Sequence, residues 1–124
     1  MKYGNRKTVF DGIQFDSQKE ARRYFELNML QRAGEIYALE LQREFELIPA
    51  QYEHFERYGK NGKRLVDGKR CIEKSCVYKA DFVYRNKDGQ LVVEDTKSKA
   101  TKTKDYIIKR KLLLWRYGIK ITEI

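Results

Sequence analysis

The sequence predicts one α/β domain in which a helix, three strands, a second helix and a final strand follow one another. Apolar residues recur with helical spacing in segments 17–33 and 103–117, and Gly34 and Gly118 stand directly after them. Between and after the helices lie segments rich in β-branched and aromatic residues, separated by turn-forming residues. At 124 residues, the chain is long enough for a single hydrophobic core. We expect an αβββαβ core with a mixed sheet flanked by the two helices, an N-terminal hairpin and a protruding basic hairpin.

Residues 1–16 contain a short basic start and a hairpin signal. Lys2, Arg6 and Lys7 are either an arm that contacts backbone phosphates of a nucleic acid or a terminus without a function. Asp11-Gly12 lies between apolar residues, which is a strong signal for a two-residue β-hairpin turn. We therefore expect a hairpin ahead of the first helix.

The first helix is expected to begin after Ser17 and to run to Ala33. A serine at this position caps a helix by accepting a hydrogen bond from a backbone amide of the first turn. Glu20 follows three residues later, in one row with Tyr24 and Leu27, and its carboxylate can close a capping box with the serine. The buried stripe is expected at positions that repeat every four residues, namely Ala21, Phe25, Met29 and Ala33.

Two further segments precede the centre of the chain. Segment 36–48 is expected to form one long strand or a bent pair that ends before Pro49. Its Gln42 is either a polar residue on an exposed strand edge or a side chain that approaches a substrate. Segment 50–76 contains tyrosines, is basic and rich in turn signals, and is expected to form an inserted, protruding hairpin. Its candidates for gripping a DNA flank are Arg57, Lys60, Lys63, Arg64, Lys69 and Arg70.

Segments 77–85 and 91–97 are expected to form an antiparallel hairpin around a polar turn. Side chains alternate along a strand, so Asp95 and Lys97 project from the same face, and Asp81 lies on the preceding strand. Two carboxylates supply the hard oxygen ligands that Mg²⁺ prefers. A lysine beside them stays protonated, so it can orient a water molecule or neutralise charge on a phosphate. These three residues are therefore the candidate catalytic group for metal-dependent hydrolysis of a phosphodiester.

The last part of the chain is expected to form a loop, a helix and a strand. Segment 98–104 is too polar to pack, and Thr103 or Asp105 can cap a helix that runs to Tyr117. The buried face of this helix is expected to carry Ile108, Leu112 and Trp115. Segment 119–124 alternates apolar and polar residues and is expected to join the interior of the sheet.

Asp81 and the tripeptide Asp95-Thr96-Lys97 resemble the signature of the PD-(D/E)XK nuclease superfamily, an Asp followed after a variable gap by Asp/Glu-X-Lys. Ala80 stands where the superfamily name has proline, and Ser98 stands where a glycine is expected after the lysine. Four longer stretches are similar to a phage-encoded family of small endonuclease-like proteins within this superfamily: FDSQKEARRY at 15–24, LELQREFEL at 39–47, YKADFVY at 78–84 and VVEDTKS at 92–98.

The resemblance implies a restriction-endonuclease-like fold and an endodeoxyribonuclease that uses Mg²⁺, for which Mn²⁺ can substitute. It implies that Asp81 and Asp95 are metal ligands and that Lys97 is the catalytic lysine. For Glu20 it offers a place in the metal site as the alternative to the capping role. Small basic relatives look like Holliday-junction resolvases, which implies double-stranded or branched DNA as substrate, a homodimer, and a role in phage recombination, replication or packaging. No small-molecule cofactor is implied.

The charge of the chain favours a nucleic-acid partner. There are 27 lysine and arginine residues against 18 aspartate and glutamate residues, a formal charge of +9. The candidate nucleic-acid contacts outside the inserted hairpin are Lys2, Arg6, Lys7, Lys99, Lys102, Lys104, Lys109 and Arg116. The alternative for these residues is an ordinary solvated surface.

Composition also limits the other classes of function. Two cysteines and one histidine are too few for a structural zinc site. No apolar run is long enough for a signal peptide or a membrane span, so we expect a cytoplasmic protein, in the host cell if it is phage-encoded, with no membrane partner. The leading hypothesis is a Mg²⁺-dependent DNA endonuclease. The alternative is a DNA-binding protein that keeps the nuclease fold without cutting, which would have no need for Asp81, Asp95 and Lys97 together.

Overall fold

The described part of the chain, residues 7–97 and 101–124 of a computed structural model, forms a mixed α/β fold of two helices, a four-stranded sheet and two hairpins. The helices are α1 (Gln18–Arg32) and α2 (Lys104–Tyr117). The strands are β1 (Thr8–Phe10), β2 (Ile13–Phe15), β3 (Ile36–Ile48), β4 (Gln51–Phe55), β5 (Gly68–Glu73), β6 (Cys76–Asn86), β7 (Leu91–Asp95) and β8 (Thr122–Glu123). The predicted order of helix, three strands, helix and strand is confirmed by α1, β3, β6, β7, α2 and β8, with β4 and β5 inserted between β3 and β6.

The sheet has the strand order β3-β6-β7-β8. Strand β6 is antiparallel to both β3 and β7, and β7 is parallel to β8. The predicted hairpin of β6 and β7 is confirmed, with Val83 opposite Val93. The expectation that the last strand lies in the sheet interior is wrong. Strand β8 pairs only with β7, through Glu94↔Thr122 and Asp95↔Glu123, and so forms an edge of the described sheet.

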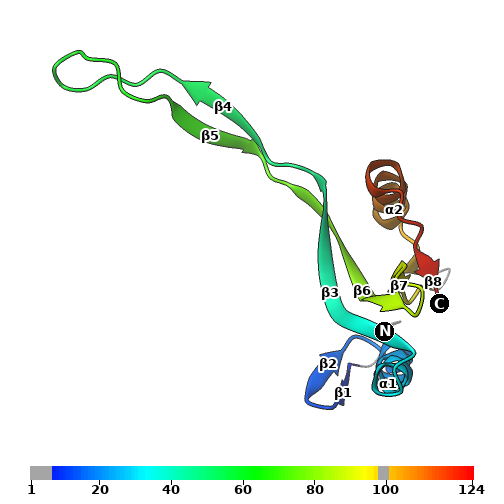
Figure 1. Cartoon of the computed structure of the whole chain (residues 1–124). Helices are drawn as coiled ribbons and strands as arrows, with labels where there is room; N and C mark the ends of the chain where they lie inside the picture. The colour runs from blue at the N-terminus through cyan, green and yellow to red at the C-terminus, as the bar shows by residue number, and fades with distance from the viewer. Residues whose placement is uncertain (1–6, 98–100) are drawn as a thin grey trace.

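Two hydrophobic cores lie on the two faces of the sheet. Figure 1 shows α1 beside the hairpin β1–β2 and α2 well separated from both. The α1 core contains Phe15, Ala21, Tyr24, Leu27, Ile36, Phe82 and Tyr84. The α2 core contains Phe45, Leu47, Tyr78, Ala80, Val83, Val93, Tyr106, Leu113 and Ile121. The strands β3 and β6 contribute to both cores, which matters for the site described below.

Helix α1 has the predicted ends but not the predicted buried face. Its cap is Ser17, and the helix ends at Arg32. The buried residues are Glu20, Ala21, Tyr24 and Leu27, whereas Phe25 and Met29 are 48% and 56% exposed and Ala33 is also exposed. The row of Tyr24 and Leu27 packs into the α1 core, and the Tyr24 ring lies 5.2 Å from that of Phe15. The predicted buried stripe is wrong except at Ala21. Helical spacing alone does not show which of two adjacent rows of side chains is the buried one.

Helix α2 also begins and ends as predicted, after Thr103 and before Gly118. Its fully buried residues are Tyr106 and Leu113, with Leu112 partly buried. The expected Ile108 and Trp115 are instead 57% and 81% exposed. The tyrosine can be buried because its hydroxyl donates a hydrogen bond of 2.6 Å to Glu123 Oε2, a partner that helical periodicity does not reveal. Neither described helix is long and apolar enough to cross a membrane.

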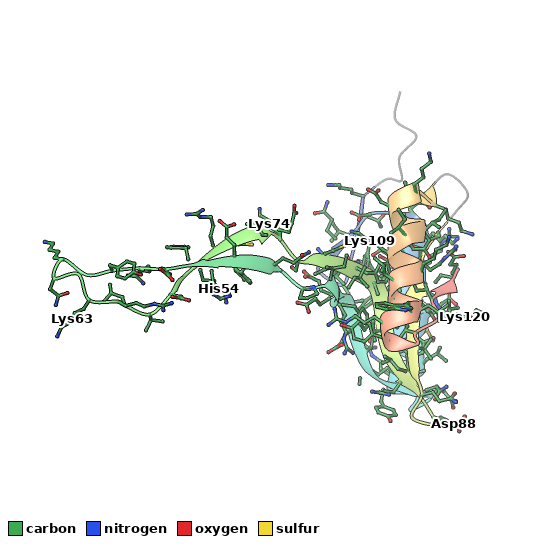
Figure 2. All side chains as sticks on the ribbon, turned by 90° about the horizontal axis from the view of Figure 1, so that it is seen from above. His54, Lys63, Lys74, Asp88, Lys109 and Lys120 are labelled. Atoms are coloured by element: carbon green, nitrogen blue, oxygen red, sulfur yellow. The ribbon has the colours of Figure 1, made fainter. Side chains whose placement is uncertain are left out.

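The inserted hairpin protrudes from the domain as predicted. We call residues 51–73 the projecting ribbon; it consists of β4, β5 and the loop between them, and it continues the antiparallel pair β3–β6 beyond Ile48 and Cys76. Figure 1 shows the ribbon extending away from both helices. In Figure 2, Lys63 lies at its far end, and Asp88 lies at the opposite end of the molecule.

Candidate active site

The candidate site lies where β3 and β6 pair at Gln42 and Asp81. In a regular strand, every second residue faces the same side of the sheet. Here alternate residues of a strand belong to the α1 core in one part of the strand and to the α2 core in the other part. In β3 they are Leu39 and Leu41 in the α1 core, and Phe45 and Leu47 in the α2 core. In β6 they are Tyr84 and Phe82 in the α1 core, and Ala80 and Tyr78 in the α2 core. Gln42 has φ 53°, a left-handed value that only an irregular strand residue adopts. The change of face therefore lets Gln42 and Asp81 leave both cores and meet each other.

Asp81 is held by donors from both neighbouring strands. Thr96 donates to Asp81 Oδ2 with its backbone N–H at 2.9 Å and with its hydroxyl at 2.7 Å. Gln42 Nε2 donates to Asp81 Oδ1 at 3.2 Å. The register Phe82↔Glu94 puts Asp81 opposite Asp95. The structure thus brings together the two carboxylates that the sequence analysis singled out.

Asp95 is almost completely buried, with 1% of its surface exposed. Its Oδ2 accepts a hydrogen bond from the Tyr78 hydroxyl and lies 3.7 Å from Lys97 Nζ. Its Oδ1 is buried and has no hydrogen-bond partner in the described chain. Buried polar atoms nearly always have a partner. This oxygen is therefore an open position for a proton or a cation.

The two carboxyl groups shift each other's pKa in opposite directions. Burial, followed by the carboxylate of Asp81, raises the pKa of Asp95 to about 8. Burial acts in the same direction on Asp81, but its interaction with the Asp95 side chain and the hydrogen bonds from Thr96 outweigh burial and lower the pKa of Asp81. Repulsion between two adjacent negative charges makes it unfavourable for both carboxyl groups to be ionised. The pair therefore holds one proton at neutral pH, on Asp95. A divalent cation can take the place of that proton.

Lys97 lies beside this pair. Besides its contact with Asp95, its Nζ lies 4.6 Å from the centre of the Tyr106 ring, which favours a cation. The backbone is fixed by the end of the chain, because the Lys97 N–H donates to Ile124 O at 3.1 Å and the Ile124 N–H donates to Asp95 O at 3.0 Å. The side chain is 21% exposed. Its ammonium group is therefore held in place yet reachable from solvent.

Glu20 contributes to the helix cap and to the site with different atoms. Its backbone N–H donates to Ser17 Oγ at 3.1 Å, which is the serine half of a capping box. Its carboxylate Oε1 accepts a hydrogen bond of 3.1 Å from Gln42 Nε2, the same nitrogen that donates to Asp81. Burial, followed by the charges of Asp81 and Asp16, raises the pKa of Glu20 to about 7. The Glu20 carboxylate thus lies at the site, and Gln42 links it to Asp81.

We call Glu20, Gln42, Asp81, Asp95 and Lys97 the carboxylate cluster. Within residues 7–97 and 101–124, no three His, Cys, Asp or Glu side chains are grouped so that they could hold a metal ion. Mg²⁺ does not need three, because it binds through one or two carboxylates and keeps several water molecules. Asp81 and Asp95, with the open oxygen of Asp95, fit such a cation. Glu20 is joined to this pair through Gln42 rather than being a third member of it.

Two residues of the site were missed by sequence reasoning. Tyr78 supplies the hydroxyl that donates to Asp95, and Thr96 supplies both donors that hold Asp81. No spacing rule links Tyr78 to the acid-X-lysine segment. Simple alternation places Thr96 on the face opposite Asp95, but Thr96 lies beyond the last residue of β7, where strand alternation no longer applies. Gln42, by contrast, was considered as a residue that approaches a substrate, and it is part of the cluster.

A buried ion pair joins α1 to β7 next to the carboxylate cluster. Glu94 on β7 is 2% exposed, and Arg23 on α1 donates to it with Nε at 2.8 Å and with Nη2 at 2.7 Å. The Tyr84 hydroxyl also donates to Glu94. Hydrogen bonding with Glu94 raises the pKa of Arg23 above its usual range, so the guanidinium stays charged. Through this contact, the helix that carries Glu20 is fixed to the strand that carries Asp95.

The predicted nucleic-acid contacts fall into three groups. Among the described residues, Lys7, Lys104 and Lys109 make no ion pair. Two others are paired, Lys102 with Glu123 Oε1 at 3.1 Å and Arg116 with Glu46 Oε1 at 3.4 Å, and Arg116 also donates to Glu46 O at 3.0 Å. Lys2, Arg6 and Lys99 lie outside the described residues. The unpaired cations therefore lie ahead of β1 and along α2.

Comparison with known proteins gives a family for the chain. Residues 1–123 match the model of a family described as "Protein of unknown function (DUF1064)". No curated protein and no solved structure matches the chain. The match spans the helices, the sheet, the projecting ribbon and every residue of the carboxylate cluster. The chain therefore belongs to the DUF1064 family.

Proposed function

We propose that this protein is a divalent-metal-dependent endonuclease that hydrolyses phosphodiester bonds of DNA. One observation carries the proposal: Asp81 and Asp95 meet beside Lys97, and one buried oxygen of Asp95 lacks a partner in the described chain. The resemblance of these residues to the PD-(D/E)XK signature supports it. The order of helices and strands is the one expected for a restriction-endonuclease-like fold, which is part of the same proposal.

The members of the carboxylate cluster have different roles in the proposed hydrolysis. Asp81 and Asp95 would hold Mg²⁺ or Mn²⁺, which when bound polarises a phosphate and lowers the pKa of water. Lys97 donates to a phosphate oxygen and offsets the negative charge that builds there. Glu20, with a pKa of about 7, accepts the proton of the attacking water at neutral pH. Water is thereby added across one P–O bond, and the leaving oxygen becomes a hydroxyl.

The proposed substrate is double-stranded or branched DNA, as for Holliday-junction resolvases. The formal charge of +9 supports an anionic polymer as partner. Lys104 and Lys109 on α2 are available for backbone phosphates because they make no ion pair in the described chain. Holliday-junction resolvases cut both strands as dimers, so a homodimer belongs to the proposal by analogy. Its setting would be phage recombination, replication or packaging in the cytoplasm of the host.

The test is cleavage of linear and branched DNA in the presence of Mg²⁺ or Mn²⁺. The wild type should cut, Asp95→Asn should bind DNA without cutting, and Asp88→Asn should behave as the wild type because Asp88 lies in the exposed turn between β6 and β7. A wild type that binds but cuts no substrate with either metal would favour a non-catalytic DNA-binding protein. Full cleavage by Asp95→Asn would place the chemistry elsewhere in the molecule.

A further inference from the structure

The projecting ribbon has no hydrophobic core of its own. All five residues of β4 are exposed, and β5 is exposed except for Gly68. Its large apolar side chains face solvent, among them Tyr58, Val66 and Ile72 at 58%, 85% and 54% exposure. An isolated two-stranded hairpin is at best marginally stable in water. The ribbon therefore contributes little to the stability of the domain and offers nearly all its side chains to a partner.

The charge of the ribbon is positive after its internal ion pairs are taken into account. Residues 51–73 contain six basic and four acidic residues. Three of the four acids are already bonded within the ribbon: Glu53 to Arg70 at 2.8 Å, Asp67 to Arg64 at 2.9 Å, and Glu56 to the Tyr58 hydroxyl at 2.7 Å. Arg57, Lys60 and Lys63 make no ion pair in the described chain. The unpaired positive charge thus lies toward the tip.

The ribbon is stiffened by stacking of its own side chains. Phe55 lies so close to Gly68 that a Cβ atom at this position would be 2.2 Å from the ring. Arg70 lies 5.2 Å from the centre of the Phe55 ring, and Lys69 lies 4.1 Å from that of Tyr52. These contacts join the side chains of β4 and β5 to one another.

We propose that the projecting ribbon binds duplex DNA along its major groove, beside the point at which the carboxylate cluster acts. This inference rests on the proposed function for the position of the DNA at the body. The major groove of B-form DNA, about 12 Å wide, admits a two-stranded β-ribbon. The unpaired cations contact phosphates on the groove walls, and the exposed Tyr58 and Val66 contact base edges. The partner is DNA, because the major groove of an RNA duplex is too deep and narrow for side chains to enter.

The length of the ribbon sets how much DNA it covers. It continues the strand that carries Asp81, and an extended strand rises about 3.3 Å per residue. Lys74 at the base is seven residues from Asp81, which corresponds to about 23 Å or about 7 base pairs at about 3.4 Å each. Lys63 is eighteen residues away, so it reaches at most about 59 Å or about 17 base pairs. Only a duplex longer than this span touches both the cluster and the tip.

Charge argues against a second copy of the chain as the occupant of this surface. The same unpaired cations would face one another if two ribbons paired, and the chain as a whole carries +9. DNA offers the opposite charge along the whole length of the ribbon. An anionic, elongated partner therefore fits the ribbon better than a copy of itself.

The experiment compares the wild type with Lys60→Gln/Lys63→Gln in binding to DNA duplexes of about 12 and about 40 base pairs, with divalent metal chelated so that nothing is cut. Two lost phosphate contacts should lower the slope of log affinity against log salt by about 2 and weaken binding of the long duplex about thirtyfold at 0.15 M salt. The ratio of the affinity for the long duplex to that for the short duplex should therefore be about thirtyfold larger in the wild type than in the ribbon variant. The matched control, Lys79→Gln/Lys120→Gln, removes two exposed lysines of the body that make no ion pair in the described chain, and should lose much less.

Four outcomes would overturn the inference: an unchanged slope and affinity in the ribbon variant, an equal loss in the control variant, an equal loss on an RNA duplex of the same length, or an altered oligomeric state in sedimentation. Circular dichroism of each variant tests whether it is folded. The result is separable from the proposed catalysis. Ribbon-dependent binding by a wild type that never cuts would leave the ribbon inference standing and remove the nuclease. If Asp95→Asn abolishes cleavage and the ribbon variant binds DNA like the wild type, the proposed nuclease stands and the ribbon inference is overturned.

Discussion

At the scale of single residues, Lys97 has a role that the two aspartates cannot fill. Its ammonium lies 3.7 Å from Asp95 Oδ2 but cannot ligate a cation, so in the proposed hydrolysis its partner is the phosphate rather than the metal. Lys97→Met keeps the length of the side chain and removes the charge. We expect the cleavage rate to fall at least a hundredfold, because the charge that builds on the phosphate is no longer offset.

Binding of Mn²⁺ to Lys97→Met, measured by titration calorimetry, should persist, since Asp81 and Asp95 are intact. The matched control is Lys79→Met, which removes an exposed lysine from β6. Loss of metal binding in Lys97→Met, as severe as in Asp95→Asn, would mean that the lysine only supports the carboxylates.

The pH dependence of stability follows from the buried carboxyl groups. In the metal-free protein, the pKa of Asp95 is about 8 and that of Glu20 is about 7, both above their ordinary values near 4. The folded state therefore keeps protons that the unfolded chain releases, and this stabilising effect is complete below about pH 4 and is lost as the pH rises through 7 to 8. The lowered pKa of Asp81 acts in the opposite sense, but only below its ordinary value, outside this window.

We therefore expect the free energy of unfolding, measured by urea denaturation in a chelator, to decrease from pH 6 to pH 9. Asp95→Asn imitates the protonated acid and should flatten this dependence. Addition of Mg²⁺ should restore stability at high pH, because the cation replaces the proton. A stability that rises between pH 6 and pH 9 in the metal-free wild type would contradict the assigned protonation of the pair.

The residues of the site were only partly accessible to sequence reasoning. Alternation correctly placed Asp95 and Lys97 on one side, since Lys97 Nζ lies 3.7 Å from Asp95 Oδ2, although β7 itself ends at Asp95. Alternation cannot predict the change of face at Gln42 and Asp81, since it arises from a left-handed residue in a strand whose composition gives no sign of it. The donor Tyr78 lies on β6 and the donor Thr96 directly follows β7, and no spacing rule in the sequence links either of them to its partner.

At the scale of helices and strands, the ends were predictable and the faces were not. Ser17, Thr103 and Gly118 act locally, through the backbone groups of the adjacent turn, and the structure has them at the expected caps. The buried face of a helix depends on what the sheet presents to it. Tyr106 is buried outside the expected apolar repeat, and its hydroxyl donates a hydrogen bond to Glu123 Oε2.

The contact of Arg23 with Glu94 is the main polar link between α1 and β7. Because Glu94 is 2% exposed and receives two hydrogen bonds from Arg23, removal of the arginine leaves a buried carboxylate without its counter-ion. Arg23→Met should lower the free energy of unfolding by about 3 kcal/mol at pH 7. The control is Arg22→Met, which removes an exposed arginine of the same helix and should change stability by less than about 0.5 kcal/mol.

The double variant Arg23→Met/Glu94→Leu tests the cause. It removes both charges, so it should be more stable than Arg23→Met alone in the same urea denaturation experiment. If the double variant loses as much stability as the sum of the single variants, packing rather than charge holds the helix to the strand.

At the scale of the whole molecule, the strands β3 and β6 connect the fold to its two functional parts. One end of this pair contributes to the α1 core and the other to the α2 core, the site lies at the change between them, and the projecting ribbon continues the pair beyond Ile48 and Cys76. The sequence predicted the order of elements and the protrusion, because turn signals and apolar spacing are local. It did not predict that β8 is an edge strand, because strand order depends on contacts between distant segments.

This arrangement implies that the body folds without the ribbon. Neither core contains a residue from 49–75, and Ile48 pairs with Cys76 where the ribbon begins. Replacement of 49–75 by Asn-Gly should close β3 and β6 with a two-residue hairpin turn and change the free energy of unfolding by less than about 1 kcal/mol. Mn²⁺ binding should be unchanged, while affinity for a long DNA duplex should fall at least as far as in Lys60→Gln/Lys63→Gln. A shortened protein that unfolds would show that the ribbon is a structural element of the domain. A folded one that binds long DNA as tightly as the full chain would show that the ribbon is not its DNA-binding extension.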